Sequence, residues 1–317
     1  MSIQVRSGKA FEFACLNALL SYLGHAQQVV VEQSNALHNA RVSYENLSAE
    51  ARRSRDRAAA AAVRVLVRLE PQLVNPQANI PLVLSIAPDV RGQRGDVRDI
   101  LAVRRQNDWE IGISAKNNHE AVRHSRLSPT IDFGRQWLGF PCTRQYYTDI
   151  TPIFNELALL REQGEYWRNL QNKALRFYVP VLKAFIAELG RLYGAYGVAV
   201  PDRLARYLLG VHDFYKVIAQ HSTQTTTIQA FSFNGTLNRP SGSVMPQIRL
   251  PNLNLPTRIL AMEVAQGSMD TINIFCDAGW SISARIHNAE SLVIPSLKFD
   301  IRLVSIPPSL HTHHEPW

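Results

Sequence analysis

Apolar positions recur with a helical period in the first seventy residues of the chain. One such stretch runs from Gly8 to Leu23 and a second from Leu47 to Leu69. Asn46 or Ser48 is placed to cap the second helix, and Pro71 is placed to end it. The pattern therefore predicts that residues 8–70 are helical.

After this region the pattern changes to that of strands. Residues 80–86 form an apolar run of strand length, and a turn-like stretch follows over 88–95. Two short strands are then expected over 99–103 and 109–116, joined by the polar connector 104–108 as in a hairpin. The first of the two is apolar on both faces, which is typical of a strand in the middle of a sheet.

The second strand of this hairpin alternates strictly between two faces. One face is apolar and must pack on a core, whereas the other carries small, polar or charged side chains. The apolar set is Ile111, Ile113 and Ala115, and the other set is Glu110, Gly112, Ser114 and Lys116. If the two strands pair as a hairpin, Asp99 and Lys116 come close together.

The rest of the chain predicts helices first and strands afterwards. Helices are expected within residues 118–220, at 153–163, 181–192 and 203–209, and strands at 226–233, 258–264, 271–276, 280–287 and 296–304, with a tight turn at Asn234-Gly235. This order indicates an α+β fold with a mixed sheet. We expect an N-terminal core over 1–150, a helical region over 151–224, a β-rich region over 225–306 packed on the core, and a disordered tail over 307–317.

Composition adds a strong positive charge. The 317 residues carry a net charge of +8, and six lysines leave 28 arginines among the 34 basic residues. Such a chain favours an acidic partner, either nucleic acid or an anionic membrane surface. Arginine suits this role better than lysine, because its guanidinium makes two hydrogen bonds at once to a phosphate or to the edge of a guanine. A basic protein without such a partner, or a GC-rich genome that inflates arginine, explains the same composition.

The cysteines and the N-terminus bear on the compartment. Cys15, Cys142 and Cys276 are far apart and have no metal-binding or redox spacing, which suggests reduced thiols. The first residues lack the apolar segment of a signal peptide, and there is no run of about 18 apolar residues that predicts a membrane span. We therefore expect a soluble cytoplasmic protein with no membrane partner.

The hairpin carries the candidate chemistry. Hydrolysis of a phosphodiester needs a carboxylate-held Mg²⁺ and a cation that stabilises the phosphate in the transition state. An aspartate at a strand start, followed by acid-x-lysine on the next strand, is the core of the PD-(D/E)XK nucleases. Asp99 with Ser114-Ala115-Lys116, 15 positions later, resembles this core. A salt bridge at a sheet edge or a Ser-Lys hydrolase are the alternatives.

Ser114 departs from the motif, because it removes one expected carboxylate. Glu12, Asp96 and Glu110 are candidates to replace it. We favour Glu12, since Gly8-Lys-Ala-Phe-Glu12 resembles the first motif of archaeal Holliday-junction resolvases, in which the helix glutamate joins the metal site. The resemblance implies Asp99, Glu12 and the Ala115 carbonyl as Mg²⁺ ligands, Lys116 acting on nucleophile and phosphate, and Ser114 holding a water. Asp96 is the fallback for Asp99.

A longer resemblance covers nearly the whole chain. The segments that carry it are 95–100, 109–119, 121–128, 132–137, 229–237, 279–289 and 295–301, and together they look like the HaeIII restriction endonuclease family. The resemblance implies Mg²⁺-dependent cleavage of double-stranded DNA at the palindrome GGCC. It also implies a bacterial restriction–modification system with a cognate DNA methyltransferase, and a palindromic site suits a homodimer.

Two groups of residues are candidates to contact DNA. Asn118, His119, Arg123, His124 and Arg126 follow the lysine, where a helix is expected, and Arg285, His287, Asn288 and Lys298 lie in the C-terminal strands. His119 as a general base, or simply polar surface positions, are the alternatives. Competing functions are a structure-specific repair nuclease, a DNA-binding protein with a degenerate core, and a basic protein without a DNA partner.

Overall fold

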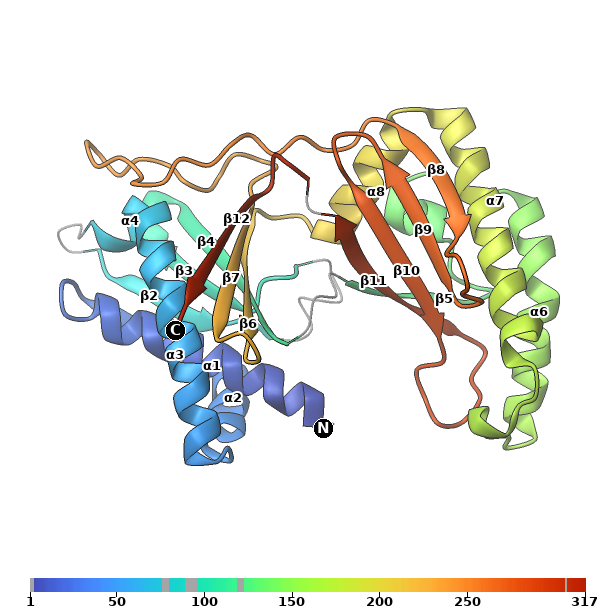
Figure 1. The fold of residues 1–317 in the computed structure, drawn as a ribbon, viewed down its shortest axis with the longest axis horizontal. Coiled ribbons are helices and arrows are strands. Elements are labelled where there is room, and N and C mark those ends of the chain that lie inside the picture. The colour runs from blue at the N-terminus through green and yellow to red at the C-terminus, as the bar shows by residue number, and fades with distance from the viewer. Residues whose placement is uncertain (1–2, 76–79, 89–95, 119–122, 306) are drawn as a thin grey trace. The chain divides into compact units, whose positions relative to one another are not determined.

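The computed structural model describes residues 3–75, 80–88, 96–118, 123–305 and 307–317 (Figure 1). They form two compact units, and each is described by itself. The first unit is Met1–Glu120, Gly210–Leu253 and Ser309–Trp317, and the second is Ala121–Leu209 and Asn254–Pro308. This division differs from the three predicted regions, because strands far apart in the sequence pair within one sheet.

The first unit is built on a mixed seven-stranded sheet. Its strands, in spatial order, are β1 (Val29–Val31), β2 (Leu82–Ile86), β3 (Ile100–Arg104), β4 (Trp109–Asn117), β6 (Phe214–Gln220), β7 (Thr225–Phe231) and β12 (His311–Pro316). The β1–β2 and β4–β6 pairs are parallel and the others are antiparallel. Its helices are α1 (Ile3–Leu23), α2 (Asn35–Glu45), α3 (Ala49–Leu69) and α4 (Pro71–Val74). The coarse prediction of an α+β fold with a mixed sheet is confirmed.

The core of this unit lies between the helices and one face of the sheet. Ile111, Ile113 and Ala115 of β4 are buried there with Phe11 and Leu19 of α1. The predicted hairpin forms with Ile100 opposite Ile113, so that β3 lies between β2 and β4 as its apolar sequence indicated. Alternation along β4 therefore places Ser114 and Lys116 on the opposite side of the strand.

The second unit is an antiparallel five-stranded sheet with helices on one face. Its strands, in spatial order, are β5 (Arg123–Leu127), β11 (Leu297–Ser305), β10 (Ser281–His287), β9 (Thr271–Cys276) and β8 (Ile259–Val264). Its longer helices are α6 (Arg144–Glu162), α7 (Val179–Tyr196) and α8 (Ala199–Leu209). Trp137 and Phe185 pack on Phe299 of β11, and Phe133 packs on both of them, which joins the helical layer to the sheet.

Several predictions of local structure are wrong. Residues 311–316 form β12 and are not a disordered tail, because their backbone pairs with the edge of β7 and Glu315 binds Arg64 at 2.9 Å. Residues 29–31, 123–127 and 214–220 are strands within regions predicted to be helical. These strands gain their stability from partners distant in the sequence, which a local pattern does not register.

Among the described residues, no helix combines the length and the apolar character that a bilayer crossing requires. The three cysteines carry no disulfide bond. Cys15 and Cys276 are buried, and the thiol of Cys142 accepts a hydrogen bond from the Gly134 backbone, so their contacts in the structure are those of packing residues.

Candidate active site

The hairpin of β3 and β4 gathers three donors on one carboxylate oxygen. Asp99 Oδ2 accepts hydrogen bonds from Ser114 Oγ at 3.2 Å, the Ala115 backbone N–H at 2.8 Å and Lys116 Nζ at 3.1 Å. The backbone N–H of Asp99 in turn donates to the Ile113 carbonyl at 2.8 Å. The hairpin register therefore fixes both ends of the Asp99–Lys116 pair that the sequence predicted.

Helix α1 brings a second carboxylate to the same place. Glu12 is buried, with 6% of its surface exposed, and its Oε2 lies 3.1 Å from Lys9 Nζ. Burial and then the negative charge of Asp99 raise the pKa of Glu12 to about 7, although Lys9 and Lys116 act in the opposite direction. Because the charge of Asp99 acts on Glu12, the two carboxylates lie near each other.

The donor atoms around this space fit a hard divalent cation. Within the described ranges, the hydrogen bonds of the Asp99 carboxylate all end on Oδ2, which leaves Oδ1 without a donor there. The N–H and C=O of one strand residue point to the same side, so the Ala115 carbonyl points toward Asp99, as its N–H does. Two carboxylates and a carbonyl form the oxygen set that Mg²⁺ accepts, since Mg²⁺ keeps several waters.

No set of three or more His, Cys, Asp or Glu side chains among the described residues has the arrangement of a metal site. That result is consistent with the donor set at Asp99, because only two of its members are such side chains and the third is a backbone oxygen. Mg²⁺ is commonly held in proteins by one or two carboxylates together with waters and substrate phosphates.

The structure gives Asp96 and Glu110 a different partner. Arg98, which is 5% exposed, contacts Asp96 Oδ1 through Nε at 2.8 Å and Glu110 Oε1 through NH1 at 2.6 Å. Burial alone would raise the pKa of Asp96, but its hydrogen bonds with Arg98 outweigh this and lower it. A Cβ on Gly112 would lie 1.9 Å from Arg98 Cδ, so the glycine makes room for this arginine. These contacts favour Asp99 and Glu12 over Asp96 and Glu110 as the acidic pair.

A half-buried polar network that the sequence analysis missed adjoins Lys116. His221, in the turn between β6 and β7, contacts Asn117 Oδ1 through Nε2 at 2.5 Å and Ser54 Oγ through Nδ1 at 2.8 Å. Asn117 Nδ2 donates to Ser7 Oγ at 2.7 Å, and Arg55 NH2 donates to the same hydroxyl at 2.9 Å. The network ties the end of β4 to α1 and α3, and no local sequence signal points to it.

The start of α3 is rich in arginine, a pattern typical of a solvated helix face, but Arg55 within it is buried. Its exposed fraction is 9%, and burial lowers the pKa of its guanidinium. The same guanidinium, together with burial, lowers the pKa of His221. Arg57 lies over the Trp317 ring at 5.8 Å, so two of these arginines have structural partners.

Lys216 is a second lysine near the hairpin. It lies on β6 in register with Ser114, and the two residues are 5% and 2% exposed. Residues in register on neighbouring strands are about 4.8 Å apart and point to the same face. The buried Ser114 hydroxyl therefore lies between the Asp99 carboxylate and the strand that carries Lys216.

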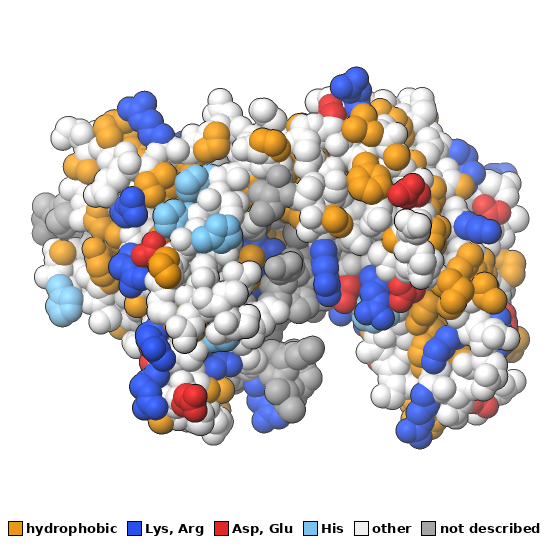
Figure 2. Space-filling model, viewed as in Figure 1, with side chains coloured by type: hydrophobic (Ala, Val, Ile, Leu, Met, Phe, Trp, Pro, Cys, Tyr) orange, Lys and Arg blue, Asp and Glu red, His pale blue; other side chains and the backbone are white. Residues whose placement is uncertain are grey.

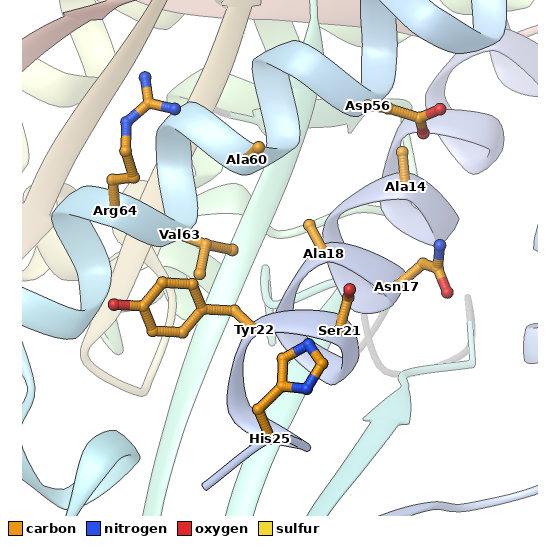
Figure 3. A pocket seen from close by; sticks show the side chains of 10 residues that line it. All are labelled: Ala14, Asn17, Ala18, Ser21, Tyr22, His25, Asp56, Ala60, Val63 and Arg64. Carbon is orange, nitrogen blue, oxygen red and sulfur yellow. The ribbon is translucent and has the colours of Figure 1, made fainter.

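A cavity of about 630 Å³ in the first unit is separate from this chemistry. It lies between α1 and α3, and Figure 3 shows the small side chains that line it together with Tyr22, His25, Asp56 and Arg64. None of the residues around Asp99 lines it. The Asp56 carboxylate is bound by the Tyr44 hydroxyl at 2.8 Å, so the cavity has the character of a groove between packed helices.

The described residues among the predicted DNA contacts after Lys116 do not form a helix. Asn118 is exposed, has a left-handed φ of 53°, and accepts a hydrogen bond from the His221 N–H at 3.2 Å. His119 lies outside the described residues. Arg123, His124 and Arg126 belong to β5, and of these side chains only Arg126 is described; it is exposed and donates to Ser296 Oγ at 3.1 Å.

The C-terminal candidates lie in the sheet of the second unit. Arg285 is paired with Asp270 at 3.0 Å, and His287 lies 3.8 Å from Asp300. The His287 ring and the Asn288 side-chain amide contact backbone carbonyls of the loop that follows β10. Lys298 of β11 lies between two neighbouring strands. It is directly opposite His287 of β10 on one side and opposite Arg126 of β5 on the other. The register thus brings Arg126, His287 and Lys298 into one row.

Comparison with known proteins decides the family. The model of the HaeIII restriction endonuclease family matches residues 8–307. The chain belongs to this family. It is 40% identical over 311 residues to the type II restriction enzyme HaeIII of Haemophilus aegyptius, a match that covers 98% of this chain and 97% of the relative. No solved structure matches the chain.

Membership of the HaeIII family makes this protein a type II restriction endonuclease, an enzyme that cleaves double-stranded DNA at specific sites. The match extends over both units, so both belong to what the family shares. The arrangement of Asp99, Glu12 and Lys116 must therefore be judged as a site for phosphodiester hydrolysis.

Proposed function

We propose that this restriction endonuclease cleaves duplex DNA at GGCC with Mg²⁺, at a PD-(D/E)XK-type site formed by Asp99, Glu12, Ala115 and Lys116. The observation that carries the proposal is the convergence of Lys116 Nζ and the Ala115 N–H on Asp99 Oδ2, with Glu12 beside it. The GGCC sequence comes from the resemblance to HaeIII.

Glu12, Asp99 and the Ala115 carbonyl hold the cation in this proposal. A cation held there would supply Lewis-acid chemistry, polarising the scissile phosphate and acidifying a water. Asp99 must keep one oxygen for this role while the other binds protein donors, and the contacts of Oδ2 achieve that division. Ser114, 2% exposed, holds Asp99 in this orientation through its hydroxyl and holds a water at the site.

Lys116 acts on the substrate side of the site. Its side chain is 28% exposed, so that Nζ reaches both Asp99 and an incoming phosphate. An ammonium group next to the phosphate stabilises the negative charge that develops in the transition state and orients the attacking water. The network of Asn117 and His221 fixes the strand end from which Lys116 extends.

The palindromic site suits a homodimer, because two copies related by a two-fold axis present the same contacts to both strands. In a bacterial cytoplasm such an enzyme requires a DNA methyltransferase that protects GGCC sites of the host. We include both partners in the proposal.

Digestion of plasmid DNA of known sequence tests the proposal. The wild type with Mg²⁺ is expected to give the fragments of a GGCC digest, and EDTA, Asp99→Asn and Lys116→Ala are each expected to abolish them. Lys183→Ala is the matched control, because Lys183 is an exposed lysine on α7 of the other unit. Fragments that map to another sequence overturn the specificity, and full cleavage by Asp99→Asn overturns the site.

A further inference from the structure

The sheet of the second unit has one covered and one open face. Ile274, Ile282 and Phe299 are buried on the side that packs against the helices, and Phe185 of α7 contacts Phe299 there. Residues at the alternate positions of the same strands point away from the helices. In Figure 1 the strands β8–β11 lie in front of α8, so this open face is toward the viewer.

The register places cations in rows across three neighbouring strands of the open face. Arg126 of β5, Lys298 of β11 and His287 of β10 form one row. On β11, Asp300 follows Lys298 by two residues and lies opposite Arg285 of β10. Arg302 follows by another two residues and lies opposite Ser283 of β10. Strands are about 4.8 Å apart and alternate residues about 6.6 Å apart, so these cations lie within roughly 15 Å of one another.

Most of this positive charge has no carboxylate partner. Arg285 is paired with Asp270, but the only bond of the Arg126 guanidinium within the described ranges is to the Ser296 hydroxyl. Lys298 and Arg302 have no hydrogen bond or ion pair in the part of the chain that the structure describes, and Arg302 is exposed. Figure 2 shows Lys and Arg side chains next to a few Asp and Glu side chains over β10 and β11.

The other outward side chains also suit a polyanion. Ser281 and Ser283 of β10 and Asn273 of β9 are partly exposed and offer hydrogen-bond donors between the cations. Glu263 on β8 marks the far edge of the sheet, so the positive region is confined to β5, β11 and β10. A second copy of the chain would bring the same cations against themselves, which disfavours this region as a two-fold contact between copies.

We propose that the open face of β5, β11 and β10 binds the phosphate backbone of duplex DNA, with Arg126, Lys298 and Arg302 as direct phosphate contacts. The proposal rests on the proposed function, since it adds a docking surface for the same substrate. Contacts of this kind strengthen binding without regard to sequence and release counterions from the DNA.

The test is the salt dependence of DNA binding by the full chain in EDTA, measured by fluorescence anisotropy with duplexes that contain or lack GGCC. Each phosphate contact contributes about 0.9 to the slope of log K against log salt. Arg302→Gln is expected to lower the slope by about 1, and the triple variant Arg126→Gln/Lys298→Gln/Arg302→Gln by about 3, with both duplexes. Arg161→Gln, an exposed arginine of α6, is the matched control and keeps the wild-type slope.

A triple variant with the wild-type slope overturns the surface, even if the wild type cleaves GGCC. A lowered slope together with wild-type protein that does not cleave GGCC leaves the surface in place and removes the proposed function. Light scattering supplies a further check, since a triple variant that changes its oligomeric state in solution identifies the face as a contact between copies and overturns the DNA assignment.

Discussion

The buried carboxyl of Glu12 links the stability of the protein to pH and to Mg²⁺. Its pKa of about 7 in the folded protein exceeds the ordinary value of 4.5, first because of burial and then because of Asp99. The folded state therefore holds this proton more tightly than the unfolded chain. Its contribution to stability is complete below pH 4.5 and is lost as the pH rises to about 7, beyond which nothing further is lost.

The size of this effect follows from the two pKa values. One pKa unit corresponds to about 1.4 kcal/mol, so the change between 4.5 and about 7 amounts to roughly 3 kcal/mol. Glu12→Gln carries no titrating group, and we expect its free energy of unfolding to lack this fall between pH 5 and pH 8. At pH 8 without metal it is expected to be more stable than the wild type.

Urea unfolding at pH 5, 6, 7 and 8, in EDTA and in Mg²⁺, measures both effects. If Glu12 and Asp99 are the metal ligands as proposed, Mg²⁺ is expected to stabilise the wild type at pH 8, since it would bind their ionised carboxylates in the folded state only. Glu12→Gln is expected to lose this stabilisation and cleavage activity together. Burial also raises the pKa of Glu70 to about 7, so Glu70→Gln serves as the matched control. This variant is expected to lose a similar part of the fall in stability with pH, but to keep the stabilisation by Mg²⁺.

Parallel stability curves for the wild type and Glu12→Gln in EDTA would refute this reasoning. Equal stabilisation of both proteins by Mg²⁺ would refute the assignment of Glu12 as a metal ligand, whatever the pH dependence shows. The two observations are independent, because the first concerns the proton on Glu12 and the second concerns the cation.

Three further predictions concern the hairpin and the C-terminus. Ser114→Ala removes one donor from Asp99 and is expected to lower kcat about 10-fold with the fold intact, as single-turnover cleavage will show. Gly112→Ala is expected to lower the free energy of unfolding by about 1–3 kcal/mol in urea, because the new Cβ meets Arg98, and unchanged stability would contradict that contact. Deletion of residues 309–317 removes β12 and is expected to leave a protein that aggregates at the exposed β7 edge in size-exclusion chromatography.

The hairpin of β3 and β4 could be predicted from the sequence because its signals are local. Strict alternation over residues 109–116 and a short polar connector determine which residues of β4 face the core and which strand is its neighbour. The antiparallel pairing then places Asp99 next to Lys116 with no further information. The expectation that these two side chains come together is confirmed at 3.1 Å.

The division of the chain into two units could not be predicted in the same way. Strand β6 pairs in parallel with β4, about a hundred residues earlier in the chain, and β12 completes the same sheet from the C-terminus. Neither strand has an alternation that distinguishes it locally, since β6 is buried on both faces and β12 carries histidines on an edge. Their position depends on partners supplied by the whole fold.

Local sequence patterns also do not indicate the residues near the site whose contacts are all with distant parts of the chain. His221 was not a candidate, because nothing in residues 214–225 indicates that its ring reaches Asn117 and Ser54. Arg55 belonged to a run of arginines whose usual place is at the surface, yet the structure buries it against Ser7. In both cases the signal lies in the packing of α1 and α3 against the sheet and not in the sequence around the residue.

The serine at position 114 has a physical rationale in the charge balance of the site. Glu12 already lies near Asp99, and burial together with the negative charge of Asp99 brings the pKa of Glu12 to about 7. An acid at position 114, which is 2% exposed, would add a third carboxylate to the same buried space and raise that repulsion further. With serine there, α1 supplies the second carboxylate and the strand supplies a neutral donor to Asp99, so that the proposed site offers two carboxylates to one divalent cation.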